Sequence, residues 1–448
     1  MFMIFTNFLR ISSSPALVSR LFPFSCRYLH KCAVSDQSVA YWKNNLYGFY
    51  QWFVGFSEAE ACFKIKAKKR MGKLHSFYFE FEIHLHIDDI ELLRIIRDIL
   101  GVGIVYAREK SNSCSYIVGN EEGLRFLIDI FDRYTFNGIK LLDYIDFRYA
   151  FLLYFDRNGT LTNELIAKIL HVKVGMNKGR VNFSMPSDHV VNITEYWLLG
   201  LIEGEGSFSL ARSKLRPNFQ LLFTEAQKFL LEEIRNYLIS NLGFDKFSLW
   251  KLNNSSLIGI CVMKSKGKAK PTVSLEIRSV HLLRNYILPF LNSMHFISKK
   301  RHDFRDFILI CNALYSGKHL HDNEIKDLIL KVALTMNDYR LSTNKAYSKV
   351  TLSSEELTTL KNLAYSSPSA LRESMEGLVS SLNNNVVYHI VSPTNELIVG
   401  SLKETSEIVN VNSNTLSKLF KASGSNSVEV NNNSITIVKV FSEHTSSQ

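Results

Sequence analysis

Two short stretches of the chain, 145 positions apart, carry the same pattern of aromatic, small and acidic residues. The first runs from Trp52 to Phe63 and the second from Trp197 to Phe208. Small residues four positions apart share one face of a helix, so each stretch predicts a short apolar helix that another backbone can approach closely. Because the two patterns match in register, we expect the partner of each helix to be the other copy.

The small residues predict where the two helices meet. Gly200 and Gly204 are four positions apart in the second stretch, and Gly55 and Ala59 hold the matching positions in the first. Glycine weakens a helix interior by about 1 kcal/mol relative to alanine, so two glycines in one short helix indicate a packing requirement. We expect these four residues to form the contact between the helices.

Each stretch ends in two acids separated by one residue, Glu58 and Glu60 in the first and Glu203 and Glu205 in the second. The C-terminus of a helix carries about half a negative charge, so carboxylates there are disfavoured unless a cation neutralises them. Two such ends brought together would offer the oxygen ligands that divalent metals prefer. Ordinary core helices with solvated glutamates are the alternative, but duplication of the whole pattern favours the metal site.

Composition limits the class of protein and of partner. The 448 residues, 46% of them hydrophobic, are enough for several domains with apolar cores. The net charge of +11 and the pI of about 9.2 favour a polyanionic partner. The six cysteines show no C-x-x-C pair and no zinc spacing, which predicts reduced thiols. No apolar run approaches the length of a membrane span, so no membrane partner is expected.

Residues 1–35 differ from the rest of the chain because they contain no acid. They carry scattered arginines, a lysine, a serine cluster and large apolar residues, which is typical of a mitochondrial transit segment. A disordered leader, or upstream coding sequence of an intron-borne reading frame, is the alternative. Either interpretation excludes this segment from the fold.

The elements that follow the first acid-tipped helix recur in the same order after the second. In the first half, periodicity predicts strands near 63–70, 77–87, 105–106 and 114–118, with helices over 88–100 and 123–131. In the second half it predicts strands near 208–210, 219–223, 250–263 and 273–277, with helices over 227–242 and 281–291. Lys140 and Lys300 each open a closing Lys-x-x-Asp-aromatic element. This repeat predicts a duplicated domain.

Domain boundaries follow from the repeat. The first domain is placed at 40–158 and the second at 191–341, with the polar segment 159–190 as the linker between them. Asn192 and Glu195 have the spacing of a capping box, which predicts the start of the second acid-tipped helix.

These residues together resemble the LAGLIDADG homing endonucleases, specifically the single-chain, two-motif type carried by mitochondrial group I introns. The resemblance covers roughly residues 40–340 and includes both helices, both Lys-x-x-Asp-aromatic elements and the strand-helix order between them. It implies an α+β fold of two αββαββα domains. The two domains would be related by a pseudo-twofold axis, with their helices packed together and their sheets forming a saddle on double-stranded DNA.

The resemblance also implies the site residues and the reaction. The second acid of each motif, Glu60 or Glu205, would bind catalytic Mg²⁺, while Glu58 and Glu203 would belong to the helix interface. Lys140 and Lys300 match the family's basic residue near each scissile phosphate, although a solvated lysine at a helix end is the alternative. The implied function is metal-dependent hydrolysis of both DNA strands at an intron insertion site, by a mitochondrial monomer with internal pseudo-symmetry.

Strand residues would then contact the DNA, mixing phosphate and base-edge contacts along the major groove. The candidates are Lys64, Lys66, Lys68, Arg70, Arg212, Lys214, Arg216, Gln220 and Lys268.

Two residues depart from the family pattern in the first motif. Ser57 replaces the usual apolar residue, and Ala61 replaces the usual glycine after the metal-binding acid. Alanine adopts a left-handed conformation at a greater cost than glycine does. The first helix is therefore expected to end differently from the second, with a less efficient half-site at Glu60.

The tail has two predicted parts, a helical connector over 342–383 and a small αβ module over 384–441. The helix pair of the module weakly resembles the small DNA-binding repeats attached to intron-encoded nucleases. Its candidate recognition residues are Ser413, Asn414, Thr415 and Lys418. An αβ appendage with no role in DNA binding is the alternative.

Two other functions are compatible with the same fold. The chain could be a maturase that assists splicing of its own group I intron RNA, in which case the acids would be dispensable. It could also be a DNA-binding regulator without catalysis, although the intact Glu60 and Glu205 argue against that function.

Overall fold

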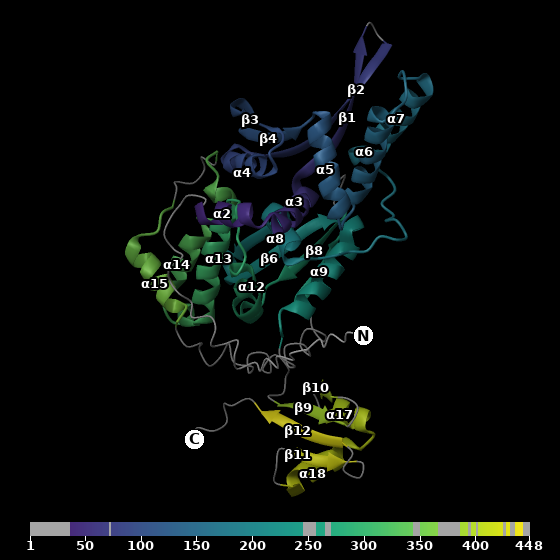
Figure 1. Cartoon of the computed structure of the whole chain (residues 1–448). Helices are drawn as coiled ribbons and strands as arrows, with labels where there is room; N and C mark the ends of the chain where they lie inside the picture. The colour runs from purple at the N-terminus through teal and green to yellow at the C-terminus, as the bar shows by residue number, and fades with distance from the viewer. Residues whose placement is uncertain are drawn as a thin grey trace, which may run out of the picture.

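The computed structural model describes residues 36–70, 73–244, 257–264, 270–343, 350–365, 386–392, 396–399, 402–423, 427–430 and 435–441. Within them the chain forms two α+β domains and a small C-terminal module (Figure 1). The predicted leader 1–35, part of the strand 250–263, part of the connector 342–383 and Lys268 fall outside these residues. The structure therefore does not test those predictions.

The first domain contains a four-stranded antiparallel sheet in the order β1-β2-β4-β3. Its main elements are α2 (Asp36–Asn44), α3 (Leu46–Glu60), β1 (Ala61–Arg70), β2 (Lys73–His86), the 3-10 helix η2 (Ile87–Asp89), α4 (Ile90–Leu100), β3 (Ile104–Arg108), β4 (Ser113–Val118), α5 (Glu121–Arg133), α6 (Lys140–Phe155) and α7 (Asn163–Gly175). The long β1–β2 hairpin projects from the domain at the top of Figure 1.

The second domain repeats this architecture, with a sheet in the equivalent order β5-β6-β8-β7. Its main elements are α8 (Glu195–Glu205), β5 (Gly206–Ala211), η5 (Arg212–Lys214), β6 (Arg216–Thr224), η6 (Glu225–Gln227), α9 (Lys228–Asn241), β7 (Ile258–Met263), β8 (Thr272–Ile277), α11 (Val280–Leu282), η7 (Leu283–Ile287), α12 (Leu288–Asn292), α13 (Lys300–Tyr315), α14 (Asn323–Ala333), η9 (Asn337–Arg340) and α15 (Ser354–Leu363). The predicted duplicated α+β fold is confirmed.

One face of each sheet belongs to the apolar core and the other carries polar side chains. In β2, Phe79 and Phe81 are buried in the core, as the predicted alternation requires. The residues between them, Glu80 and Glu82, point to the opposite face. In β6 the same alternation buries Phe219 and directs its neighbours to the polar face. Each domain therefore presents one polar sheet face that its helices do not cover.

The repeat extends further than the sequence interpretation placed it. The segment interpreted as a linker contains α7, which packs against α6, and its counterpart α14 packs against α13. After each of these helices an asparagine, Asn177 or Asn337, lies in a left-handed turn at φ 54°. The N–H of each asparagine donates to Asp143 or Asp303, at 2.9 Å in both cases. Their side-chain amides donate to β1 and β5. Through these two hydrogen bonds, each asparagine connects the last helices of its domain to the first strand.

The start of the second acid-tipped helix differs from the prediction. Its N-cap is Thr194, whose hydroxyl accepts a hydrogen bond from the N–H of Trp197 at 3.2 Å. The predicted capping box of Asn192 and Glu195 is wrong because Asn192 lies outside the helix and pairs elsewhere. Its N–H donates to the side-chain oxygen of Asn137 at 2.8 Å.

The C-terminal module has a core of its own, which includes Leu416, Phe420 and Ile437. Its elements are β9 (Val386–Val391), β10 (Glu396–Val399), α17 (Leu402–Val409), α18 (Ser413–Ser423), β11 (Ser427–Val430) and β12 (Ile435–Phe441), with sheet order β10-β9-β12-β11. The sequence predicts strands at 386–391 and 434–441 and helices at 402–409 and 413–420, and these correspond to β9, β12, α17 and α18. The two shorter strands, β10 and β11, were missed because each spans only four residues.

Candidate functional site

The two signature helices, α3 and α8, cross at the junction of the domains (Figure 1). A Cβ atom on Gly55 would lie 2.0 Å from the carbonyl oxygen of Trp197, and one on Gly200 would lie 2.0 Å from that of Trp52. No side chain larger than hydrogen fits at either position without moving a backbone. The contact is reciprocal, as a pseudo-twofold axis requires.

The C-terminal ends of the two helices also converge. A Cβ atom on Gly204 would lie 2.3 Å from the Cβ of Ala59 and 3.7 Å from the Oε1 atom of Glu60. The carboxylate of Glu60 therefore lies beside the last turn of α8, the turn that carries Glu205. The structure thus brings together the two acids that the sequence assigned to metal binding.

The first acid of each motif is buried and bonded to main chain. Glu58 accepts hydrogen bonds from the N–H groups of Asn137 and Gly138, at 2.8 and 3.0 Å. Glu203 accepts from Ile297 and Ser298, at 2.9 and 2.6 Å. Each of these acids therefore fixes the loop before the helix that begins with Lys140 or Lys300. Burial raises the pKa of Glu58 to about 7 and raises that of Glu203 as well.

The two tryptophans at the helix interface are not equivalent. The indole N–H of Trp52 donates to the carboxylate of Glu203 at 2.7 Å. The indole nitrogen of Trp197 is buried, and it has no hydrogen-bond partner among the described residues. The carboxylate of Glu203 is therefore tied across the interface, whereas that of Glu58 is held within its own domain.

The second acids, Glu60 and Glu205, are half-buried at the helix ends. Burial and the negative charge of Glu205 raise the pKa of Glu60 to about 7. Burial also raises the pKa of Glu205, against the opposing charges of Lys300 and Lys140. Two half-buried carboxylates with raised pKa values at the negative ends of two helices form a site that a bound cation would stabilise.

Two lysines cap the same helix ends. The ammonium group of Lys140 donates to the carbonyl oxygen of Ala61. That of Lys300 donates to the carbonyl oxygens of Gly204 and Gly206, at 2.7 and 2.5 Å. Burial lowers the pKa of Lys300, against the opposing charge of Glu60. The structure thus places both predicted lysines beside the acids rather than in solvent.

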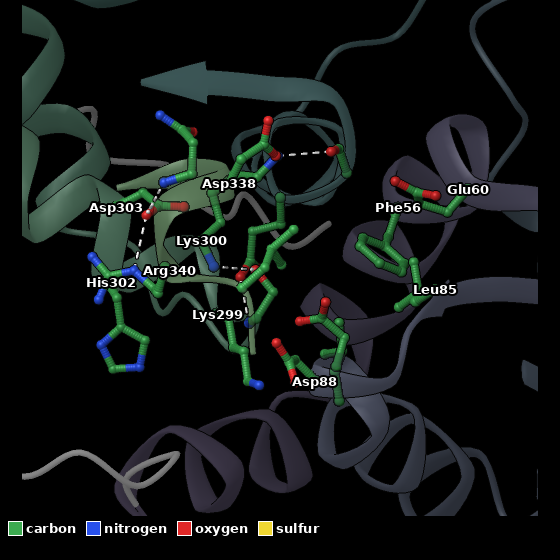
Figure 2. Close-up of a pocket in the computed structure, with 17 residues that line it drawn as sticks. Phe56, Glu60, Leu85, Asp88, Lys299, Lys300, His302, Asp303, Asp338 and Arg340 are labelled. Atoms are coloured by element: carbon green, nitrogen blue, oxygen red, sulfur yellow. Dashed lines mark hydrogen bonds and ion pairs between the residues drawn. The ribbon is translucent and has the colours of Figure 1, made fainter. Parts of the chain in front are cut away.

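A pocket opens next to Glu60 at the junction of the domains. Figure 2 shows Lys300 and Arg340 on one wall and Glu60 and Phe56 on the other. The pocket also contains Asp89, whose pKa is raised by burial against the opposing charge of Lys299. The sequence interpretation missed Asp89. Asp89 was placed in the first turn of the helix predicted over 88–100, and nothing in that position distinguishes it from an ordinary exposed acid.

The first signature helix ends as the second does, which corrects the expectation for Ala61. The backbone at Ala61 has φ −85° and ψ 155°, and that at Gly206 has φ −67° and ψ 140°. Both are extended conformations that any residue adopts, so replacing glycine by alanine costs no left-handed strain. Ser57 is buried, and its hydroxyl has no hydrogen-bond partner among the described residues.

The residues present fit a hard divalent cation with an incomplete protein ligand set. Among the described residues, no group of three or more His, Cys, Asp or Glu side chains could hold a metal ion. Glu60 and Glu205 would provide carboxylates to such an ion, and the protein would leave its other ligands to water and phosphate oxygens. Mg²⁺ binds in this way, through one or two carboxylates and a substrate phosphate.

The predicted DNA-binding residues lie in two places. Lys64, Lys66 and Lys68 lie on the polar face of β1, and Gln220 lies on that of β6. Arg212, Lys214 and Arg216 are exposed at the turn between β5 and β6. The side chain of Arg70 and the whole of Lys268 fall outside the described residues.

Glu80 and Glu82 lie beneath the first group of lysines, and the sequence interpretation did not predict these ion pairs. Lys66 lies 2.8 Å from Glu80, Lys64 pairs with Glu82, and Arg108 lies 3.4 Å from Glu82. Both acids are buried, with 5% exposure.

None of the helices in the described part of the chain is long and apolar enough to cross a membrane.

Known proteins resemble this chain in sequence and in fold. The family model for the LAGLIDADG endonuclease matches residues 53–151 and 198–311. An uncharacterized mitochondrial protein, RF1, of Saccharomyces cerevisiae is 26% identical over 363 residues, which cover 77% of this chain and 72% of that protein. The probable intron-encoded endonuclease Cox1-I1b of Schizosaccharomyces pombe is 28% identical over 198 residues, covering 44% of this chain and 50% of that protein.

Solved structures agree in fold. The LAGLIDADG homing endonuclease I-GzeII in complex with its DNA target superimposes with a TM-score of 0.54 at 23% identity, over 65% of this chain and 99% of that chain. The enzyme I-SmaMI, bound to uncleaved DNA in the presence of calcium ions, gives a TM-score of 0.52 at 21% identity, over 64% of this chain and 98% of that chain. Both signature helices, the duplicated fold and the family model agree, so the chain belongs to the LAGLIDADG endonuclease family as a member with two motifs in one polypeptide.

Proposed function

We propose that this protein is a site-specific endonuclease that cuts both strands of duplex DNA at an intron insertion site in mitochondrial DNA. The observation that carries the proposal is the meeting of Glu60 and Glu205 at the ends of two packed helices, with Lys140 and Lys300 bonded to the same ends. Relatives named as probable intron-encoded endonucleases, and relatives of the same fold bound to DNA, support the assignment of substrate.

Hydrolysis of a phosphodiester needs an activated water, neutralisation of the charge that develops on the phosphate and stabilisation of the leaving oxygen. Divalent ions held by Glu60 and Glu205 would supply Lewis acidity and lower the pKa of a bound water. The two carboxylates lie at helix C-termini, which already carry partial negative charge. A divalent cation bound there would neutralise both. One acid per domain allows one cleavage centre for each DNA strand.

Lys140 and Lys300 act on the same reaction centre through charge and position. Their ammonium groups are fixed by main-chain carbonyls at the helix ends, so they cost little reorganisation when a phosphate arrives. Each places a positive charge beside an acid, where it stabilises a phosphate that gains negative charge. Glu58 and Glu203 hold the loops that carry these lysines and do not contact the substrate themselves.

The uncovered polar faces of the two sheets provide the DNA-binding surface. Both faces belong to one chain and are related by the contact of α3 and α8, so the protein acts on an asymmetric duplex as a monomer. Arg212, Lys214 and Arg216 add positive charge at the β5–β6 turn, where they suit phosphate contacts.

Replacing Glu205 by glutamine tests the proposed function. We expect Glu205→Gln to abolish cutting of intronless mitochondrial DNA in Mg²⁺, because one charged ligand is lost, while specific DNA binding is retained. Sequencing of the DNA ends and a gel-shift assay with Ca²⁺ measure the two effects. Glu195→Gln, on the exposed first turn of the same helix, is the matched control and should cut normally. Continued nicking of both strands by Glu205→Gln would contradict the assignment.

The C-terminal module is proposed as a second DNA-binding unit. Its helices α17 and α18 are joined through a left-handed turn at Asn410, with φ 52°, as in a helix-turn-helix unit. Asn414, Thr415 and Lys418 lie exposed on α18, while Leu416 anchors the helix in the core. Deletion of 384–448 should shorten the DNA footprint and weaken binding. An unchanged footprint would show that the module has no role in DNA binding.

A further inference from the structure

The polar faces of the two sheets differ at positions that the pseudo-twofold axis makes equivalent. In the first sheet, Lys64 of β1 pairs across the ladder with Glu80 of β2. The equivalent pair in the second sheet is Ser209 of β5 and Asn218 of β6. Two residues closer to Glu60 and Glu205 along the strands, Cys62 faces Glu82 in the first sheet, and Ser207 faces Gln220 in the second.

Strands β1, β2 and β3 carry a charged network on the polar face of the first sheet. Glu80 and Glu82 are buried, while the side chains of Lys66 and Arg108 are 53% and 43% exposed above them. Carboxylates this buried require paired cations. The ammonium groups are therefore held on the sheet face by Glu80 and Glu82, and they are not free to extend to the DNA backbone. This arrangement fixes cationic donors next to anionic acceptors before any ligand binds.

The polar face of the second sheet instead carries amide and hydroxyl side chains around the carboxylate of Glu276, which forms an ion pair with Arg278. The side-chain amide of Gln220 donates to Glu276 at 2.9 Å, and the hydroxyl of Ser274 donates to the same carboxylate at 3.1 Å. The side-chain oxygen of Asn218 has no hydrogen-bond partner among the described residues. Leu222 follows on the same face and is 40% exposed. The residue equivalent to Leu222 in the first sheet is His84.

The third and fourth strands of each face also differ. Ile104 and Tyr106 of β3 are exposed on the first face, and Met263 of β7 is exposed on the second, at the position equivalent to Arg108 of β3. The contrast between charged and neutral side chains therefore extends from β1 and β2 to β3, and it is reversed at Ile117 of β4 and Glu276 of β8.

Base edges in the major groove discriminate between these two chemistries. Lysine and arginine donate to the O6 and N7 acceptors of guanine, and glutamate accepts from the N4 amine of cytosine. Asparagine and glutamine instead make paired hydrogen bonds with adenine, and an apolar side chain contacts the methyl group of thymine. A lysine whose ammonium group is held on the sheet face by a buried glutamate thus presents a donor to the guanine of a G·C pair, whereas an amide beside a leucine matches an A·T pair.

We propose that the two domains recognise half-sites of opposite base composition, G·C under β1 and β2 and A·T under β5 and β6. The proposal rests on the proposed DNA-binding function and adds the base preference of each half. The residues that set the preference are Lys64, Lys66, Glu80 and Glu82 in the first domain, and Asn218 and Gln220 in the second.

Selection of duplexes from a randomised library by the full chain tests the proposal. With Ca²⁺ in place of Mg²⁺ the bound duplexes are recovered and sequenced. We expect one asymmetric site, with G·C pairs enriched on one side of its centre and A·T pairs enriched on the other. Recovery of a specific site with equal composition on both sides would overturn the base assignment and leave the proposed function intact. Recovery of no specific duplex would instead contradict the proposed function.

Exchange of the equivalent pairs assigns each half-site to a domain. Lys64→Ser with Glu80→Asn gives the first sheet the side chains of the second, and Ser209→Lys with Asn218→Glu does the reverse. Each double variant should change the preference at the facing base pairs by about tenfold, toward A·T for the first and toward G·C for the second.

The half-site on the opposite side should be unchanged in each double variant and serves as the internal control. A melting curve and retained recognition of that opposite half show that the variant is folded. If a folded variant keeps the original preference in both halves, these residues do not set the base composition.

Discussion

The two domains share a frame, with the same sheet order and equivalent main-chain contacts, yet they differ in the side chains on their polar sheet faces. The glycine contacts of α3 and α8 are reciprocal at 2.0 Å, and Asn177 and Asn337 donate to equivalent aspartates at the same distance. By contrast, charged pairs on one sheet are replaced by serine and amide side chains on the other. These main-chain contacts are matched between the halves, whereas the side chains on the polar sheet faces have diverged.

The pocket beside the acids shows a second difference between the halves. At the end of η2 the first domain places Asp89 near Glu60 and Lys299. At the equivalent position of η6 the second domain places Gln227, whose side-chain oxygen lies against Gly138. One of the two proposed cleavage centres therefore has an extra carboxylate and the other has an amide. The two DNA strands are thus expected to be cut at different rates.

The largest expected effect comes from the shared frame. Gly200→Ala places a methyl group 2.0 Å from the carbonyl oxygen of Trp52, so the helices must separate. We expect a loss of about 3 kcal/mol or more in the free energy of unfolding. Gly175→Ala, with no atom within 4 Å of the added methyl group, is the matched control. Equal melting temperatures for the two variants would show that the helix contact is not tight.

The lysines distinguish the two cleavage centres. Lys300→Met should lower the cutting rate of one strand by about a hundredfold or more, because a fixed positive charge beside the reacting phosphate is lost. Lys140→Met should act mainly on the other strand. Strand-specific end labelling of a nicked duplex measures both rates. If each variant slows both strands equally, the lysines act on the shared helix ends and not on separate centres.

The pKa of Glu60 predicts how metal binding depends on pH. Because this pKa is about 7 in the free protein, Glu60 is ionised above that pH and must lose a proton to bind metal below it. Affinity for Ca²⁺ should therefore fall by about tenfold per pH unit below 7. Titration calorimetry at several pH values measures this slope. Glu60→Gln should remove the part of the slope that Glu60 contributes, and an unchanged slope would assign it to another group.

The smallest expected effect concerns the extra carboxylate. Asp89→Asn removes a negative charge that raises the pKa of Glu60, so cutting should persist to slightly lower pH. Gln227→Glu adds a negative charge at the equivalent position. It should raise the pH below which cutting of the other DNA strand is lost. The pH profile of each strand, with a shift of a few tenths of a unit, checks both expectations. Identical shifts on both strands would mean that the centres are electrostatically coupled.

Much of the frame could be predicted from the sequence because it depends on local patterns. Gly55 and Gly200 mark the helix contact through spacing alone, and the alternation at Phe79 and Phe81 identifies the core face of β2. The cap at Thr194 was missed because Asn192 offers the same chemistry two residues earlier. Local sequence patterns therefore predicted which helices and strands form more reliably than they predicted the residue at which each begins.

The parts that sequence reasoning missed depend on the register between distant strands or on contacts across the domain junction. Lys64 was predicted to contact DNA, but its pairing with Glu82 requires the alignment of β1 on β2. Asp89 joins the pocket only because the first domain packs on the loop that carries Lys299. Similarly, α7 was interpreted as part of a linker because the segment 159–190 as a whole is mixed and polar, and the packing of α7 against α6 is not visible in the sequence.

The contact between α3 and α8 has a consequence for hybrid proteins that combine domains of different relatives. Because the closest approach at Gly55 and Gly200 is made by carbonyl oxygens and α-carbons, it places few demands on the rest of either half. A half taken from a relative should dock onto this chain if it brings a glycine at the crossing and a small residue one turn later. Recombination between such genes could then combine two sequence preferences without redesigning either one.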